Sequence, residues 1–283
     1  MTRTTTAIWR DPGILIVPAI AFLVLGFAVP LALFFVETLR EIGSFADIVD
    51  EAVTTISSRA VVNAMFTTNW IALLVTLLTL FAGYPIAYVL ANSDRLRFTL
   101  ILFCIIVPYF TSVIVRTYSW MVLLGRNGII NQLLLGSGLV DHPIALLYNK
   151  LGIVIGMTYV LLPYMILTLY AAMKAIDPSF LRAAHALGAS RTYAFLHVYL
   201  PLSAHGVLSG CLIVFILAIG FFITPALMGG PSDVMIAMLI ERSVEITLDW
   251  PSAAIMSLLL LAVTLVLYAV YYRVTDVRRM MGT

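Results

Sequence analysis

The residues of this sequence that could carry out chemistry are few and scattered. The chain has only two lysines, Lys150 and Lys174, and neither follows a glycine. It therefore lacks the phosphate-binding pattern Gly-x-x-x-x-Gly-Lys-Ser/Thr and cannot hydrolyse ATP itself. The histidines show no metal-ligand spacing such as His-Glu-x-x-His; they are His142, His185, His197 and His205. We expect no catalytic residue, no metal and no bound cofactor on this chain.

The composition is that of an integral membrane protein. Of the 283 residues, 62% are hydrophobic and only 11% are charged, whereas soluble domains carry about 25% charge. All fourteen acids fall in loops or at the edges of apolar stretches. Proton-coupled carriers often bury such groups within the membrane, so this placement weighs against a secondary transporter.

Six apolar stretches are long enough to cross a hydrocarbon core of roughly 30 Å. They lie near residues 13–36, 66–91, 98–124, 151–173, 206–228 and 252–272. The first lacks a small-residue cleavage site and is too long for a signal peptide, which favours a retained anchor. Short helices are expected at 45–53 and 131–136, and the segment 234–240 either dips toward the membrane or forms an interfacial helix.

The charges of the flanking segments predict the orientation. One set of flanks, with both termini and the loop 174–205, carries ten cations and four acids, whereas the other set carries five cations and ten acids. By the positive-inside rule, both termini and the loop 174–205 are cytoplasmic.

This loop is too apolar to be a simple cytoplasmic connection. Asp177 suits a helix N-cap and Pro178 the first helical position, and apolar residues recur at helical spacing until Gly188. Ser190 can cap a second helix that runs to Pro201. The sequence therefore predicts a helix, a glycine corner and a helix, which together present a small apolar knob. Exposed apolar surface of this kind usually marks a docking site.

The spacing within the loop resembles that of binding-protein-dependent ABC transporter permeases. Their pattern is Glu-Ala-Ala, three residues, Gly, nine residues, an aliphatic residue, any residue and Leu-Pro; Ala183, Ala184, Gly188 and Pro201 stand in register with it. The departure is Arg182, which replaces the glutamate and reverses its charge. The resemblance implies a coupling helix that seats in a groove of an ATPase subunit, through Arg182, Ala183, Ala184, Leu187, Gly188 and Pro201.

A second stretch, from Arg116 to Gln132, resembles the spermidine/putrescine subgroup of these permeases in its arginine, aromatic-rich turn, Leu-Leu-Gly and Asn-Gly. The resemblance implies a polyamine as solute; related permeases carry amino-acid derivatives or opines. Arg116 is either a structural anchor at the membrane edge or a substrate contact. The candidates for the substrate path lie in outer halves of spans and in outer loops: Tyr109, Phe110, Phe221, Phe222, Thr224, Asp233 and Glu241.

The family resemblance implies an all-α, six-span type I ABC importer permease fold in a single domain over residues 1–283. It also implies a bacterial cytoplasmic (inner) membrane location and several partners. These are a second, related permease chain that forms a heterodimer with this one, two ATPase subunits that hold ATP and Mg²⁺, an extracytoplasmic substrate-binding protein and membrane lipid. Nucleic-acid binding is not expected, because the loop has few cations and lies against a membrane. A secondary transporter, a channel or an assembly protein remain the alternatives from the residues alone.

Overall fold

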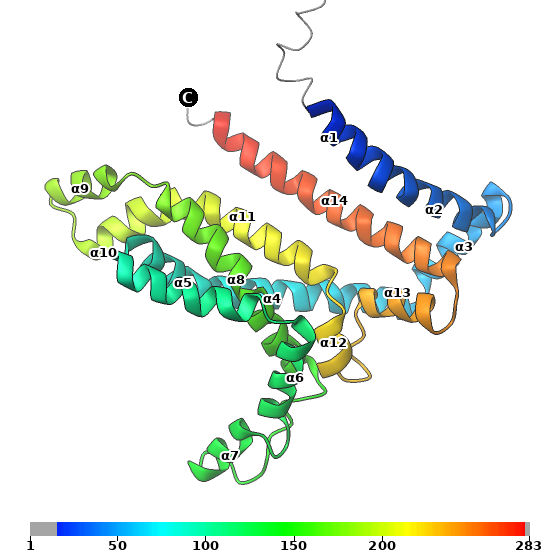
Figure 1. The fold of residues 1–283 in the computed structure, drawn as a ribbon, viewed down its shortest axis with the longest axis horizontal. Coiled ribbons are helices and arrows are strands. Elements are labelled where there is room, and N and C mark those ends of the chain that lie inside the picture. Colours follow the sequence, from blue (N-terminus) through cyan, green and yellow to red (C-terminus); the bar gives the residue numbers. More distant parts are fainter. Residues whose placement is uncertain (1–15, 281–283) are drawn as a thin grey trace, which may run out of the picture.

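The computed structural model describes residues 16–280, and side chains as far as residue 273, as an all-helical protein (Figure 1). The longest helices are α4 (Arg59–Asn92), α8 (Lys150–Lys174), α11 (Leu200–Ile219) and α14 (Trp250–Met280). The first described span is formed by α1 (Ile16–Leu23), the π-helical turn η3 (Val24–Ala28) and α2 (Val29–Arg40).

The core of the protein is the bundle of α4, α8 and α11. Ile71, Leu169 and Val214, one from each helix, are fully buried and belong to one apolar cluster. Glycines allow the three helices to approach closely. A Cβ at Gly206 on α11 would overlap the Cβ of Ala172 on α8, and one at Gly210 would lie 2.8 Å from the Met165 sulfur. We call α4, α8 and α11 the packed bundle.

The stretch 98–124, expected as one span, is divided into α5 (Arg95–Tyr109) and α6 (Val113–Leu124). The two segments meet at a bend of 97°. Pro108 lies one residue before the end of α5; it has no N–H to donate and its ring crowds the preceding turn, which favours a break at this point. Five described helices are long and apolar enough to cross a membrane, and six if this bent pair is one span.

The stretch 206–228 also differs from the expected single span. It begins earlier, because α10 (Arg191–Ala194), the π-helical turn η4 (Phe195–Tyr199) and α11 form one span from Arg191. It ends at Ile219, before the separate helix α12 (Ile223–Met228). In a continuous helix the ring of Pro225 would clash with the carbonyl of Phe221, whereas in α12 Pro225 occupies the first turn, where its missing N–H is not needed.

Short helices lie at the opposite end of the molecule from α9 (Pro178–Ala186) and α10 (Figure 1): α3 (Phe45–Ser57) and α13 (Ile236–Glu245). The expected helix 45–53 is thus present and four residues longer. Its N-terminus is a capping box: the Ser44 N–H donates to the Asp47 carboxylate over 2.8 Å, and the Ser44 hydroxyl oxygen accepts from the Asp47 N–H. The Ser44 hydroxyl also donates to that carboxylate over 2.7 Å. These hydrogen bonds to Ser44 lower the pKa of Asp47.

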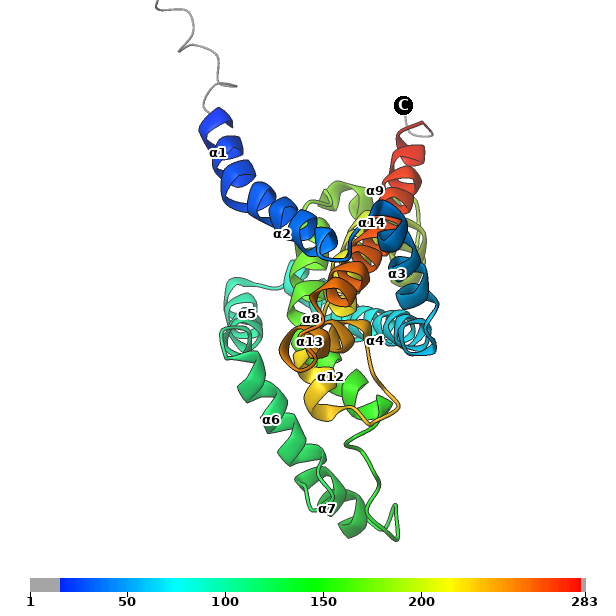
Figure 2. The ribbon, with the colours of Figure 1, turned by 90° about the vertical axis from the view of Figure 1, so that its right-hand side faces the viewer.

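Two parts stand away from the packed bundle. No residue of α1 is buried, and α1–α2 diverge from α14 along their length (Figure 2). On another side, α6 and α7 (Ile129–Gly136) form an arm whose loop is held by Asn131, which donates to the Ile144 carbonyl and accepts from its N–H.

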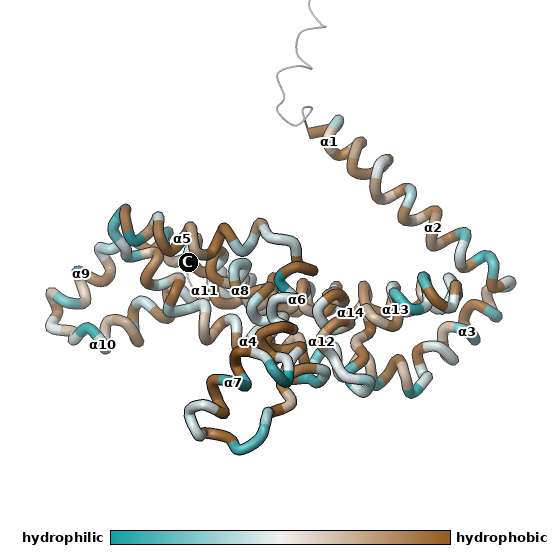
Figure 3. The backbone as a smooth tube through the Cα atoms, turned by 60° about the horizontal axis from the view of Figure 1, so that its bottom comes forward, coloured by the Kyte–Doolittle hydropathy of each residue, from teal (hydrophilic) through white to brown (hydrophobic). Residues whose placement is uncertain are grey.

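Hydrophobic residues dominate α1, α2 and α5, and hydrophilic ones gather around α9–α10 and the α3 and α13 end (Figure 3).

Candidate coupling surface and translocation path

The predicted helix, glycine corner and helix are confirmed between Asp177 and Tyr199. Asp177 caps α9, its carboxylate accepting the Ser179 N–H over 2.8 Å. This hydrogen bond from the backbone lowers the pKa of Asp177. Gly188 turns the chain with φ at +88°, a left-handed conformation that glycine adopts without steric cost. Ser190 then caps α10, its hydroxyl accepting from the Tyr193 N–H.

The corner displays apolar side chains to the outside. Leu187 is 89% exposed, and Phe180 and Tyr193 are each more than half exposed. Beside Leu187 lies an open hollow of about 580 Å³, lined by Ala184, Leu187, Gly188, Ala189, Ser190, Tyr193 and Val198. Arg182 and Ala183 are exposed on α9. A projecting leucine next to a hollow is a surface that can interlock with a complementary protein surface.

An aromatic cluster ties the base of the corner to the packed bundle. Tyr88 on α4 lies edge-on to Phe195 and Tyr199, with ring centroids 5.4 and 5.0 Å away. The hydroxyls of Tyr84 and Ser203 are 2.8 Å apart. Sequence reasoning missed this cluster; the signal was the pair of tyrosines four residues apart on α4, one helical turn, at the same helix end as the loop.

Pro201 does not end the second helix, as its place at the end of the loop suggested. The chain passes through it into α11, because η4 widens the turn just before it: the Leu200 N–H donates to Phe195 O, five residues back. Such a turn suits this position, since proline has no N–H with which to continue the regular pattern. The second helix of the knob, α10, is therefore continuous with α11 through η4.

The aromatic candidates for the substrate path lie at the two helix breaks. Tyr109 ends α5, and its ring lies 5.6 Å from that of Phe110 and 5.4 Å from that of Tyr164 on α8. Phe110 is 81% exposed. Phe221 and Phe222 occupy the break between α11 and α12, Phe221 against the core cluster and Phe222 exposed.

The polar candidates differ in their surroundings. Thr224 is fully buried, and its hydroxyl lies 3.0 Å from that of Thr117 on α6. Asp233 is 4% exposed and accepts from the Gly230 N–H, so it closes the turn of its own loop. These two residues have structural contacts in this conformation, whereas Glu241 is half-buried on α13.

These features define a class: a membrane-spanning transport subunit with an exposed helical knob built onto its central helices. The chain belongs to the family of binding-protein-dependent transport system inner membrane components, which matches residues 83–279. It is a permease subunit of an ABC importer, a transport component rather than an enzyme, and passes several times through the inner membrane.

Several proteins are similar to this chain. The spermidine/putrescine transport system permease protein PotB of Escherichia coli (strain K12) is 36% identical over 202 residues, 71% of this chain and 74% of PotB. PotB of Haemophilus influenzae is 35% identical over 198 residues, 70% and 69% of the two chains. A chain of a bacterial alginate ABC transporter, solved with an alginate pentasaccharide-bound periplasmic protein, shares the fold with a TM-score of 0.74 at 18% identity, covering 100% of this chain and 99% of that one.

Proposed function

We propose that this chain forms half of the translocation path of an importer for a polyamine such as spermidine or putrescine. The observation that supports its role in energy coupling is the exposed knob, anchored to α4 by the Tyr88 cluster and continuous with α11. The likeness to PotB supports the choice of solute. An amino-acid derivative or an opine is the alternative solute.

The proposed complex contains this chain as a single permease domain, a second related permease, two ATPase subunits and an extracytoplasmic binding protein. ATP and Mg²⁺ belong to the ATPase subunits. The knob and both termini face the cytoplasm, where α9 seats in an ATPase groove through Leu187, Ala183 and Ala184. Closure of the ATPases would then move α8 and α11, to which the knob is joined.

The path runs past the two helix breaks. Tyr109 and Phe110 at one break, and Phe221 and Phe222 at the other, offer ring faces to a cation, each worth roughly 0.5 to 2 kcal/mol. Glu241 adds a negative charge. A slender cation with separated amines suits such a row of aromatic faces, because each amine can be held weakly and released.

The decisive experiment is to reconstitute the complex with its binding protein and measure ATP hydrolysis with polyamines, amino-acid derivatives and opines. Stimulation by polyamines alone supports the proposal, and stimulation by another class would replace the solute while keeping the mechanism. Failure of any ATPase to copurify would contradict the coupling role.

Arg182 gives a sharper test of the knob. Arg182→Glu introduces the glutamate of the family pattern and reverses the charge at this position. If the ATPase groove is acidic opposite residue 182, the two negative charges repel, and we expect weaker coupling of ATP hydrolysis to the solute. Arg126→Glu, on the α6–α7 arm, is the matched charge-reversal control. Equal ATPase stimulation in the wild type and the Arg182→Glu variant would show that the charge at this position does not contribute to docking.

A further inference from the structure

Arg116 is a buried cation for which the described part of the chain supplies no counter-charge. It lies on α6 just after the bend, and only 8% of its surface is exposed. Its Nε atom has no hydrogen-bond partner. The salt bridges found among the described side chains, Arg40 with Glu37 and Arg97 with Asp94, do not involve it. Since a guanidinium stays charged at all accessible pH values, its burial calls for an anion.

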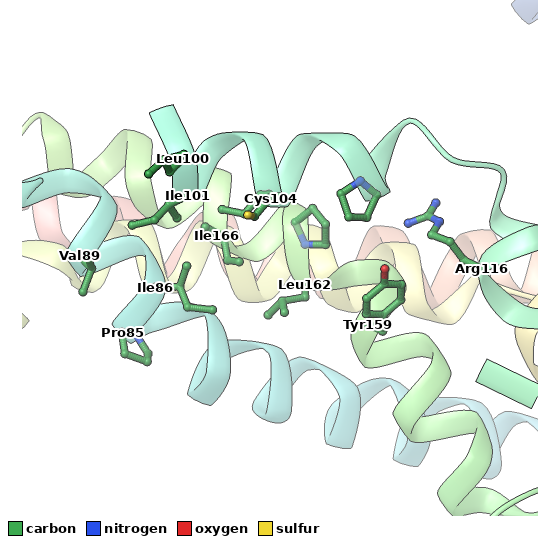
Figure 4. Close-up of a pocket in the computed structure, with 13 residues that line it drawn as sticks. Pro85, Ile86, Val89, Leu100, Ile101, Cys104, Arg116, Tyr159, Leu162 and Ile166 are labelled. Atoms are coloured by element: carbon green, nitrogen blue, oxygen red, sulfur yellow. The ribbon is translucent and has the colours of Figure 1, made fainter. Parts of the chain in front are cut away.

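Arg116 lies between two hollows, one of which, of about 360 Å³, has the polar side chains Thr111, Ser119 and Tyr159 in its lining, whereas the other is mostly apolar. This apolar hollow, of about 590 Å³, lies between α4, α5 and α8, and Arg116 stands at one end of it. Figure 4 shows the guanidinium reaching from α6 toward the end of α5, with Tyr159 beside it and a row of aliphatic side chains leading away. These include Ile86, Leu100, Ile101, Leu162 and Ile166.

The hollow follows the axis of α5. Its lining on this helix extends from Leu100 to Pro108, eight residues or about 12 Å at the helical rise. It therefore has a charged end at the bend between α5 and α6 and an apolar length along α5.

We propose that this groove holds a phospholipid, with its phosphate on Arg116 and one acyl chain along α5. The charge complementarity is direct, because a guanidinium binds phosphate with paired N–H donors. The bilayer around a membrane helix supplies lipid, and the apolar lining suits an acyl chain. If the proposed function holds, the solute is a cation that the charge of Arg116 would repel, so the solute would not enter the groove, although the groove reaches the α5–α6 break where Tyr109 and Phe110 lie.

The test is native mass spectrometry of the whole complex, purified in detergent and supplemented with 1-palmitoyl-2-oleoyl-phosphatidylglycerol or with the matching diacylglycerol. We expect retained phosphatidylglycerol with the wild type, and no retained diacylglycerol, which lacks the phosphate. Arg116→Gln should reduce the retained phosphatidylglycerol at least tenfold, and Arg116→Lys should reduce it less.

A second variant separates the groove from the charge. Cys104 lines the hollow and is exposed, so Cys104→Trp fills the groove without repacking the core and should also displace the lipid. Phe103→Trp, on the neighbouring exposed position outside the lining, and Arg126→Gln are the matched controls and should retain it.

Two results would overturn the proposal. One is equal retention of phosphatidylglycerol by the wild type, Arg116→Gln and Cys104→Trp. The other is a wild-type complex that retains no lipid, in which case a carboxylate of the second permease would be the partner of Arg116. Because this measurement reports bound lipid and not stimulation by a solute, its failure leaves the polyamine proposal untouched, and the reverse also holds.

Discussion

The packed bundle and α5 are all built from apolar sequence, yet they pack very differently. Helices α4, α8 and α11 each bury several side chains completely, whereas no residue of α5 is fully buried. Hydrophobicity alone therefore does not decide how tightly a membrane helix packs, because lipid satisfies an apolar side chain as well as a neighbouring helix does.

Small residues account for the difference. Gly83 and Gly210 lie where a Cβ would come within about 3 Å of a neighbouring helix of the bundle, at 3.1 and 2.8 Å from Met165 on α8. Helix α5 contains no glycine and no alanine between Arg95 and Tyr109. Its large side chains hold it away from α4 and α8, which leaves the hollow beneath it. The bundle can act as one rigid body, while α5 rests on its surface.

The largest expected effect is on the free energy of unfolding, when a buried residue of the bundle is compared with an exposed residue of α5. Leu169→Ala in the bundle should lower the free energy of unfolding by about 2 to 5 kcal/mol, because it leaves a cavity in a close-packed core. Phe103→Ala on α5, a residue 65% exposed, should change it by no more than about 0.5 kcal/mol. Thermal unfolding of the purified protein followed by size-exclusion chromatography measures both. Equal losses would mean that α5 is packed as tightly as the bundle.

The next largest loss of stability is expected where two helices approach closely, at Gly206. Gly206→Ala places a methyl group against Ala172, and we expect a loss of about 1 to 3 kcal/mol from overpacking. The double variant with Ala172→Gly should recover most of it. Gly26→Ala, whose added Cβ would meet nothing within 4 Å, is the control. A Gly206→Ala protein as stable as the control would show that the bundle can separate at little cost.

Substitution of Gly188 should destabilise the protein less but should impair transport strongly. Gly188→Val forces a β-branched residue into a left-handed conformation, at a cost of about 1 to 3 kcal/mol confined to the exposed corner. Membrane levels should stay normal while solute-stimulated ATP hydrolysis is lost. Gly188→Asn should keep most of the activity, because asparagine tolerates this conformation better. Unchanged transport by the valine variant would contradict this prediction.

The smallest effect concerns the pH dependence of the α9 cap. The pKa of Asp177 is lowered below its ordinary 3.8 by the hydrogen bond from the Ser179 N–H. The cap is therefore fully present above that ordinary value and is lost as the pH falls through the lowered pKa. A spin label on Leu187→Cys, with Cys104 and Cys211 replaced by alanine, should become more mobile only below about pH 4.

Asp177→Asn is the matched variant for this measurement, since asparagine caps helices without a titrating charge. Its label mobility should not depend on pH in the same range. An identical pH response of label mobility in both proteins would show that the titrating group is not Asp177.

The sequence predicted best those features that depend on local chemistry. The caps at Asp177 and Ser190 and the corner at Gly188 follow from the conformational preferences of single residues, and the structure has all three. The helix breaks were placed less well. Prolines mark both, but a proline is tolerated within a membrane helix, as Pro85 and Pro163 are here, so its presence alone does not locate a break.

Long-range pairings could not be read from the chain. The hydroxyl pair of Thr117 and Thr224 joins residues more than a hundred positions apart, and nothing local indicates that these two hydroxyls meet. The candidates Thr224 and Asp233 stay predictions for the path: the contact of Thr224 with Thr117 is such a long-range pairing, whereas Asp233 accepts from the Gly230 N–H within its own loop. Which residues meet across a bundle depends on helix rotation, which apolar periodicity leaves open when helices are apolar on every side.

The π-helical turn η4 sets the rotational phase between the knob and the span that follows it. One residue more than a regular turn is accommodated between Phe195 and Leu200. Without this wider turn, the same extra residue in a regular helix would rotate the knob by about 100° around the axis of α11, although both helices would still form. Leu187 would then project in a different direction, so the direction of the knob depends on a single turn of the backbone.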